Sequence, residues 1–201
     1  MSISYNEQER SFRLDTPDST YLINLVDEEG FLCHAYYGRR IPDDTMRYLL
    51  RLGPDQHPFR DSGQQVGLFD ALPMEYPGHG LGDFRESCLS LETEEGHRVC
   101  GLTYVSHRIY GGKPALPGLP ATYGGEGDCA TLELRCRDRF LGLEVCLLYT
   151  AFEKLDVICR SARIENRGER PVTLTAALSA CLDMDNRDFD LITLHGSWAY
   201  E

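Results

Sequence analysis

Hydrophobic and polar residues alternate along most of this chain. In the segment Thr131–Arg137, every second residue is apolar, namely Leu132, Leu134 and Cys136. Because successive side chains of a β-strand point to opposite sides of a sheet, this pattern predicts a strand with one buried face. The same period returns from Leu141 to Tyr149 after a short turn. These two segments are therefore expected to form a β-hairpin.

Two acidic, glycine-containing turns, Asp27–Gly30 and Glu94–His97, each separate two runs of apolar and β-branched residues. Glycine supplies the positive φ that a tight hairpin turn requires, so each turn predicts a further hairpin. The first hairpin joins Tyr21–Val26 to Phe31–Tyr37, and the second joins Cys88–Thr93 to Arg98–Tyr104. Other strands are expected at Ile3–Tyr5, Phe12–Leu14, Val157–Glu165, Val172–Met184 and Phe189–Leu194.

One segment, Thr45–Leu52, has the spacing of a helix, with Asp44 as a possible cap and Pro54 as its end. Strands at short intervals with almost no helix indicate an all-β protein. The chain is therefore predicted to be one domain over residues 1–201, a large antiparallel β-sandwich (supersandwich-like) with one or two short helices.

The charge balance narrows the classes of partner. The 201 residues include 20 basic and 32 acidic side chains, giving a formal net charge of −12. Nucleic-acid binding requires clustered Lys and Arg, so no nucleic-acid partner is expected. No apolar run approaches the ~18 residues of a membrane helix, and the N-terminus lacks the pattern of a signal peptide. The sequence therefore predicts a cytoplasmic protein without a membrane partner.

The potential metal ligands of the chain do not match a known spacing. Its eight cysteines are far apart, with no Cys-x-x-Cys pair and no zinc-type cluster, so they are interpreted as buried structural thiols. The carboxylate-rich segment Asp183–Asp190 fails the calcium-loop template, because Arg187, Asp188 and Leu194 occupy its key positions. No metal and no cofactor are expected.

Three residues are candidates for binding a polyhydroxylated ligand. Trp198 is the single tryptophan, and an indole face can stack on the C–H face of a sugar ring. Asp83 and Arg85 offer a hydrogen-bond acceptor and a forked donor on either side of Phe84. The alternatives are a core anchor for Trp198 and an ion pair on a loop for Asp83 and Arg85.

A second group of residues is interpreted as structural or as part of an interface. His107, Arg108, Tyr110 and Lys113 cluster at the end of an expected strand. Tyr123 lies in the irregular stretch that follows, which is rich in Gly and Pro. Long irregular loops in a compact domain usually have a function or cover a partner surface.

Several sequence motifs, taken together in chain order, are specific enough to indicate a protein family. They are Glu75-Tyr76-Pro77-Gly78-x-Gly80-x-Gly82-Asp83-Phe84-Arg85, Ser106-His107-Arg108-Ile109-Tyr110-x-Gly112-Lys113-Pro114, Gly118-Leu119-Pro120-Ala121-Thr122-Tyr123, Gly142-Leu143-Glu144-Val145, Leu148-Tyr149-Thr150, Leu178-Ser179-Ala180, Asp188-Phe189-Asp190 and Gly196-Ser197-Trp198-Ala199. With this series the chain resembles, over essentially its whole length, the N-terminal domain of the bacterial α-galactosidases of glycoside hydrolase family 36.

The resemblance implies a β-sandwich that precedes a (β/α)8 catalytic barrel in a retaining enzyme. Such enzymes release terminal α-linked galactose from melibiose and raffinose-type sugars, and many are intracellular tetramers. The family's nucleophile lies in a Lys-x-Asp motif on a barrel strand. Lys154-Leu155-Asp156 has this spacing but precedes a sandwich strand, so the match is interpreted as coincidental. Both catalytic carboxylates are then missing from these residues, and the isolated chain is expected to be inactive.

The partners implied by the resemblance are α-galactoside sugars, the enzyme's own catalytic barrel and further copies in a homotetramer. The domain would support the barrel, form subunit contacts and line the aglycone side of the pocket. One alternative from another class is an autonomous carbohydrate-binding module. A second alternative is an assembly domain with a purely structural role.

Overall fold

The computed structural model describes residues 2–26, 30–42, 45–50, 72–80, 85–118, 121–184, 188–190, 192–193 and 196. In this part of the chain ten strands and one short 3-10 helix are present. The elements are β1 (Ile3–Asn6), β2 (Ser11–Asp15), β3 (Ser19–Val26), β4 (Phe31–Arg39), η1 (Arg47–Leu50), β5 (Leu89–Thr93), β6 (Leu102–Gly111), β7 (Cys129–Asp138), β8 (Leu143–Phe152), β9 (Ile158–Asn166) and β10 (Val172–Ala177).

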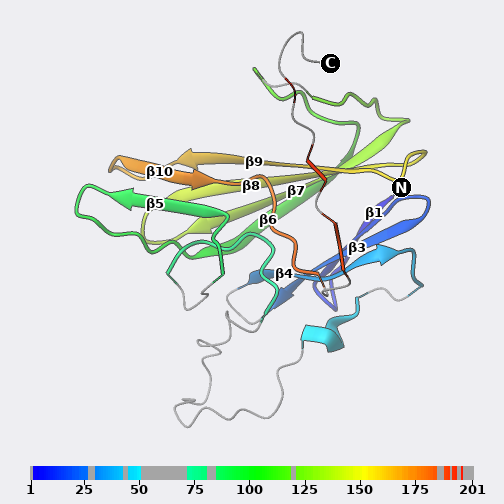
Figure 1. The fold of residues 1–201 in the computed structure, drawn as a ribbon, viewed down its shortest axis with the longest axis horizontal. Helices are drawn as coiled ribbons and strands as arrows, with labels where there is room; N and C mark the ends of the chain where they lie inside the picture. The colour runs from blue at the N-terminus through cyan, green and yellow to red at the C-terminus, as the bar shows by residue number, and fades with distance from the viewer. Residues whose placement is uncertain are drawn as a thin grey trace.

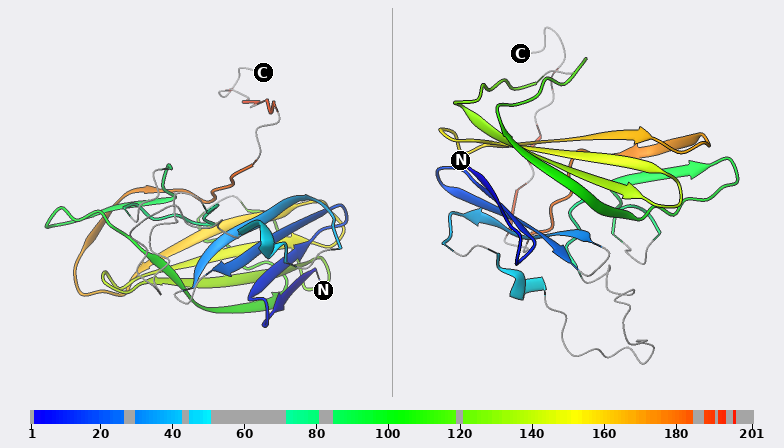
Figure 2. Two further views of the ribbon diagram at one scale, coloured as in Figure 1. Left: turned by 90° about the horizontal axis from the view of Figure 1, so that it is seen from below. Right: turned by 180° about the vertical axis from the view of Figure 1, so that it is seen from behind.

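The strands form two antiparallel four-stranded sheets and one additional pair. The first sheet has the order β1-β2-β3-β4, the second has the order β6-β7-β8-β9, and β10 pairs with β5. Figure 1 shows the blue first sheet below the long green-to-yellow second sheet. The β5–β10 pair lies at the end of the second sheet that is distant from the first, in Figure 1 and in both views of Figure 2.

The main core lies between the two sheets. Phe12, Leu14 and Ile23 from the first sheet and Leu134 and Leu147 from the second belong to one buried cluster. Each such side chain contributes about 1.5–3 kcal/mol through its transfer from water. Strand β3 is buried along its whole length. One face carries core residues, and the segment around Thr45 lies against the other, where the Asn24 side-chain amide donates to the Thr45 carbonyl at 2.9 Å. The prediction of an all-β, antiparallel sandwich is confirmed.

Two of the predicted hairpins are present. Strands β3 and β4 pair from Ser19↔Arg39 to Val26↔Phe31, and β7 pairs with β8 along its length. The expected polar face of β7 is nevertheless buried at its start, where Thr131 is fully enclosed. The reason is the connection after β6, which folds over this face, so that the Thr131 hydroxyl donates to the Gly112 carbonyl at 2.7 Å.

The predicted hairpin between Cys88–Thr93 and Arg98–Tyr104 is wrong. The turn itself forms, but β5 pairs with β10, and β6 begins only at Leu102. The returning chain is diverted because the Cys100 amide donates to the His79 carbonyl at 2.9 Å. The Gly101 amide donates to the Asp138 carboxylate at 2.7 Å, which holds the chain away from β5.

Three other boundaries differ from the prediction. The expected strand Val172–Met184 ends at Ala177. The Leu178 amide still bonds the Cys88 carbonyl, but the Leu178 carbonyl accepts from the Tyr76 phenol, and the chain then leaves the β5 edge. In the expected strand Phe189–Leu194, the described residues are not in a strand. Of the expected helix Thr45–Leu52, residues 51 and 52 lie outside the described residues. The described part forms the 3-10 helix η1, and the Leu49 amide donates to the Met46 carbonyl three residues earlier at 2.9 Å.

Candidate functional site

A buried carboxylate stands between the two sheets. Glu75 is completely enclosed, and its oxygens accept hydrogen bonds from the phenols of Tyr21 at 2.5 Å and Tyr149 at 2.6 Å. The Arg160 guanidinium pairs with the same carboxylate at 2.5 Å. The Nδ1 atom of His34 lies 3.5 Å from the second carboxylate oxygen. These five residues are called the Glu75 centre below.

Elements distant in sequence supply the members of the Glu75 centre. Tyr21 lies on β3, Tyr149 on β8 and Arg160 on β9. Glu75 itself lies in a segment that runs along β4, where the His34 amide donates to the Pro73 carbonyl at 3.0 Å and the Glu75 amide donates to Leu32 at 2.9 Å. The centre therefore joins both sheets to the segment that follows residue 71.

The electrostatics of the centre favour a fixed network. Burial, reinforced by the Glu75 charge, raises the pKa of both Tyr21 and Tyr149, so both phenols remain hydrogen-bond donors. Burial acts against the charge on Arg160, but Glu75 and the two phenols outweigh it and its pKa is raised. The guanidinium also lies over the Tyr149 ring at 5.0 Å, a favourable cation–π distance.

The Glu75 centre also holds the chain that follows β10. Arg160 donates to the Cys181 carbonyl at 3.2 Å, and the Asp183 amide donates to Nε2 of His34 at 3.1 Å. Next to the centre, the Tyr76 phenol donates to the Leu178 carbonyl at 2.7 Å. Residues 178–183 are called the anchored segment below. Because the carboxylate is enclosed and bonded on both oxygens, the centre orients chain segments and presents no reactive group.

Of the three predicted ligand-binding residues, the structure places Arg85. Its guanidinium forms an ion pair with Asp183 of the anchored segment and donates to the Leu72 carbonyl at 2.5 Å. The Arg85 side chain remains 30% exposed. Asp83 and Trp198 lie outside the described residues.

The residues predicted to cluster at the end of a strand divide between the two faces of β6. His107 packs on the Tyr5 ring, with the centroids 4.4 Å apart, and its Nδ1 lies 2.6 Å from the Tyr104 hydroxyl. Burial lowers the pKa of His107, which favours the neutral imidazole. Arg108 faces the other way and pairs with Glu133 at 2.6 Å.

Tyr110 lies near the end of β6, and Lys113 and Tyr123 lie in the connection between β6 and β7. The Tyr110 ring lies under the Arg108 guanidinium at 5.6 Å. The Lys113 amide donates to the Gly124 carbonyl at 2.9 Å, and its side chain lines a cavity of about 250 Å³ between this connection and strands β8 and β9. Tyr123 is 87% exposed.

Within the described ranges, no group of three or more His, Cys, Asp or Glu residues is placed to hold a metal ion. In the same ranges, no helix is long and apolar enough to cross a membrane.

Comparison with known proteins identifies the protein family to which this chain belongs. Residues 30–201 match the glycosyl hydrolase family 36 N-terminal domain, so the chain belongs to this family. It is 41% identical to the α-galactosidase AgaA of Geobacillus stearothermophilus over 203 aligned residues, covering 100% of this chain and 28% of AgaA. The resemblance inferred from the motifs is confirmed.

Solved structures show the same fold. The galactosidase domain of the α-galactosidase–sucrose kinase AgaSK, a protein of Mediterraneibacter gnavus, superposes with a TM-score of 0.80 at 37% identity, over 90% of this chain and 25% of that one. A Geobacillus stearothermophilus AgaA variant in complex with raffinose superposes with a TM-score of 0.75 at 39% identity, over 85% of this chain and 24% of that one. The chain therefore spans about a quarter of the length of these relatives.

Proposed function

We propose that this chain is the non-catalytic N-terminal domain of a retaining α-galactosidase. The enzyme would release terminal α-linked galactose from melibiose and raffinose-type oligosaccharides. The observation that carries the proposal is the match of the entire chain to about a quarter of AgaA at 41% identity. The raffinose complex of an AgaA variant supports the substrate class.

The structure supports a non-catalytic role for the one sequence match to the nucleophile motif. Asp156 of Lys154-Leu155-Asp156 lies in the turn between β8 and β9. Its carboxylate accepts hydrogen bonds from Ser19 at 2.7 Å and from Thr16, which fastens this turn to the one between β2 and β3. A retaining glycosidase requires two carboxylates about 5–5.5 Å apart across the scissile bond. We place both of them in the catalytic barrel, outside these residues.

Three tasks are proposed for the domain in the cytoplasmic enzyme. It supports the barrel, contributes contacts to a homotetramer, and lines the aglycone side of the pocket through Trp198, Asp83 and Arg85. The exposure of Arg85 supports the last task, because its side chain still reaches solvent beside the ion pair with Asp183. His107, Arg108, Tyr110, Lys113 and Tyr123 are proposed as structural or interface residues.

Activity assays test the proposal directly. Purified residues 1–201 should give only background hydrolysis of an activated aryl α-galactoside, whereas the complete enzyme should hydrolyse it. Turnover by residues 1–201 that persists through repurification would contradict the non-catalytic assignment. Saturable binding of raffinose by residues 1–201, without a hydrolytic domain in the same protein, would favour the carbohydrate-binding module instead.

Trp198 provides a sharper test in the complete enzyme. Loss of one stacking face should cost about 1–2 kcal/mol, or roughly a five- to thirty-fold decrease of kcat/KM for raffinose. A small aryl galactoside makes fewer aglycone contacts and should be affected less by Trp198→Ala. Equal losses on both substrates, or unfolding of the variant, would assign Trp198 to the core.

A further inference from the structure

The outward-facing side of the sheet β6-β7-β8-β9 carries an excess of arginine in an acidic protein. The outward positions of these strands hold the arginines Arg108, Arg135, Arg137 and Arg163 and the glutamates Glu133, Glu144 and Glu165, so their formal charge is 4 − 3 = +1, while the chain carries −12. A fifth arginine, Arg167, follows β9 directly and lines the hollow described below.

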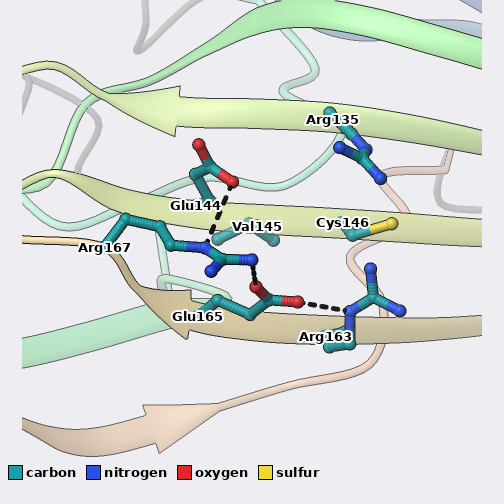
Figure 3. A pocket seen from close by; sticks show the side chains of 7 residues that line it. All are labelled: Arg135, Glu144, Val145, Cys146, Arg163, Glu165 and Arg167. Carbon is teal, nitrogen blue, oxygen red and sulfur yellow. Dashed lines mark hydrogen bonds and ion pairs between the residues drawn. The ribbon is translucent and has the colours of Figure 1, made fainter.

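Two of these arginines converge on one small side chain. Arg135 of β7, Cys146 of β8 and Arg163 of β9 stand directly opposite one another in the sheet register. Figure 3 shows the two guanidinium groups on either side of the Cys146 sulfur. Like charges on neighbouring positions of one sheet face repel each other. An anion between them would remove this repulsion.

The glutamates nearby do not occupy the space between the two guanidiniums. Arg135 uses its Nε to reach Glu133 at 3.1 Å, and Arg163 uses its Nε to reach Glu165 at 2.9 Å. Within the described part of the chain, the terminal nitrogens of Arg135 and Arg163 have no hydrogen-bonded carboxylate. Those terminal N–H groups are therefore available to a ligand.

The carboxylates are also recessed relative to the arginines. The side chain of Glu133 is 4% exposed and that of Glu165 is 32% exposed, against 50% for Arg135 and 54% for Arg163. Burial raises the pKa of the Glu133 carboxyl, but the hydrogen bonds from Arg108 and Arg135 outweigh it and leave the pKa below its ordinary value. Glu133 thus stays charged and holds its arginines in place, while the outermost layer of the face is positive.

A hollow of about 30 Å³ lies at this point, lined by Arg135, Cys146, Arg163, Glu165 and their neighbours. A cavity needs about 10–15 Å³ on this measure to hold one water molecule, so the hollow accommodates one or two oxygens of an ion that remains partly in solvent. Each guanidinium fork can take two oxygens. A carboxylate has only two oxygens and satisfies one fork, whereas a tetrahedral oxyanion can serve both.

From this geometry we infer that Arg135 and Arg163 form a binding site for a phosphate group on the outer face of the sandwich. The ligand is either free inorganic phosphate or the phosphate monoester of a small molecule such as a hexose. The site is separate from the Glu75 centre, whose Arg160 points into the core on the opposite face of β9. It does not depend on the proposed galactosidase activity.

Residue-resolved arginine labelling tests this site in the complete enzyme. The protein is treated with an arginine-specific dicarbonyl with or without inorganic phosphate, at constant ionic strength set with sodium chloride, and the modification rate of each arginine is measured by peptide mass spectrometry. At ten times the half-saturating phosphate concentration, modification of Arg135 and Arg163 should slow about tenfold. Arg98 and Arg170, which pair with single glutamates at 2.7 Å and 2.8 Å elsewhere, should be unaffected.

Matched variants decide whether the two arginines act together. Arg163→Gln should abolish the protection of Arg135 by phosphate, whereas Arg98→Gln should leave it unchanged. Parallel titration with a hexose phosphate distinguishes the two ligand sources, since protection at a tenfold lower concentration identifies the ester and equal protection identifies the free ion. Equal protection of all four arginines, no protection, or arginines 135 and 163 that do not react even without phosphate would overturn the proposal.

Discussion

Replacement of Glu75 by glutamine tests the central claim about the fold. Glu75→Gln keeps the size and shape of the side chain and removes its charge. Arg160, whose side chain is only 15% exposed, is then left in the core without its counter-charge. Tyr21 and Tyr149 donate to different oxygens of Glu75, and Gln replaces one of these oxygens by an NH2 donor, so one phenol loses its acceptor.

The expected loss follows from the burial of this ion pair. Removing one partner of a buried pair costs about 3–5 kcal/mol because the other charge remains desolvated. For a protein of this size, 1 kcal/mol corresponds to roughly 2–4 °C in melting temperature, so Glu75→Gln should melt about 6–20 °C lower. The exposed pair Arg98–Glu92 supplies the control, and Arg98→Gln should stay within about 0.5 kcal/mol of the parent.

Two measurements separate this explanation from a general loss of packing. Hydrogen exchange should accelerate at the amides of Leu178 and Asp183, because both bonds depend on the anchored segment staying in place. In a double-mutant cycle, Glu75→Gln combined with Arg160→Met should cost less than the sum of the two single changes. Stability of Glu75→Gln within 1 kcal/mol of the parent, or strict additivity in the cycle, would refute the reasoning.

Three further outcomes are expected. A hydrogen bond from Cys88 lowers the pKa of Cys181 to about 7, so iodoacetamide labelling of Cys181 should have its pH midpoint near 7 and shift upward in Cys88→Ala. Gly78→Ala should lower the free energy of unfolding by about 1–3 kcal/mol, because its Cβ would overlap the Cys100 carbonyl oxygen. The Cβ of Gly127→Ala would meet nothing within 4 Å, so that variant should be neutral in the same denaturant titration. Hydrogen bonds from Thr16 and Ser19 lower the pKa of Asp156 in the folded protein. The ionised carboxylate therefore stabilises the fold above the ordinary carboxyl pKa near 3.9, and this contribution is lost as the pH falls through the lower folded value. The melting temperatures of the parent and Asp156→Asn should accordingly differ at pH 7 and converge in acid.

The alternation of apolar residues predicted seven of the eight strands of the two sheets, whereas β6, expected at Arg98–Tyr104, runs from Leu102 to Gly111. Leu132, Leu134 and Cys136 all face the core, because only one orientation of the strand buries every second side chain when these are the apolar ones. The pattern could not reveal that β5 pairs with β10, since that pairing depends on contacts of Cys100 and Gly101 with distant residues. Local turn signals therefore identified the turn correctly and its partner strand wrongly.

The candidate site was harder to predict than the strands. Glu75 was part of a family motif, but only its apolar neighbours, Leu72, Met74 and Tyr76, indicated burial of its carboxylate. Its four partners lie between 41 and 85 residues away along the chain, so no local spacing connects them. A carboxylate within an apolar run is the one feature that could have indicated a buried ion pair.

The choice of an ion pair at the centre of this sandwich has a consequence for how the chain continues. A buried ion pair is weak evidence for stability, since well-packed apolar residues often stabilise a core at least as well. Apolar side chains would fill the space around Glu75, but they would not bond the Cys181 carbonyl. His34, which accepts from the Asp183 amide, would also lose the carboxylate beside its Nδ1. We therefore expect an apolar replacement of Glu75 and Arg160 together to preserve the two sheets while releasing the anchored segment. In that case the polar centre specifies the path along which the chain leaves the sandwich, and the apolar core alone accounts for the sandwich itself.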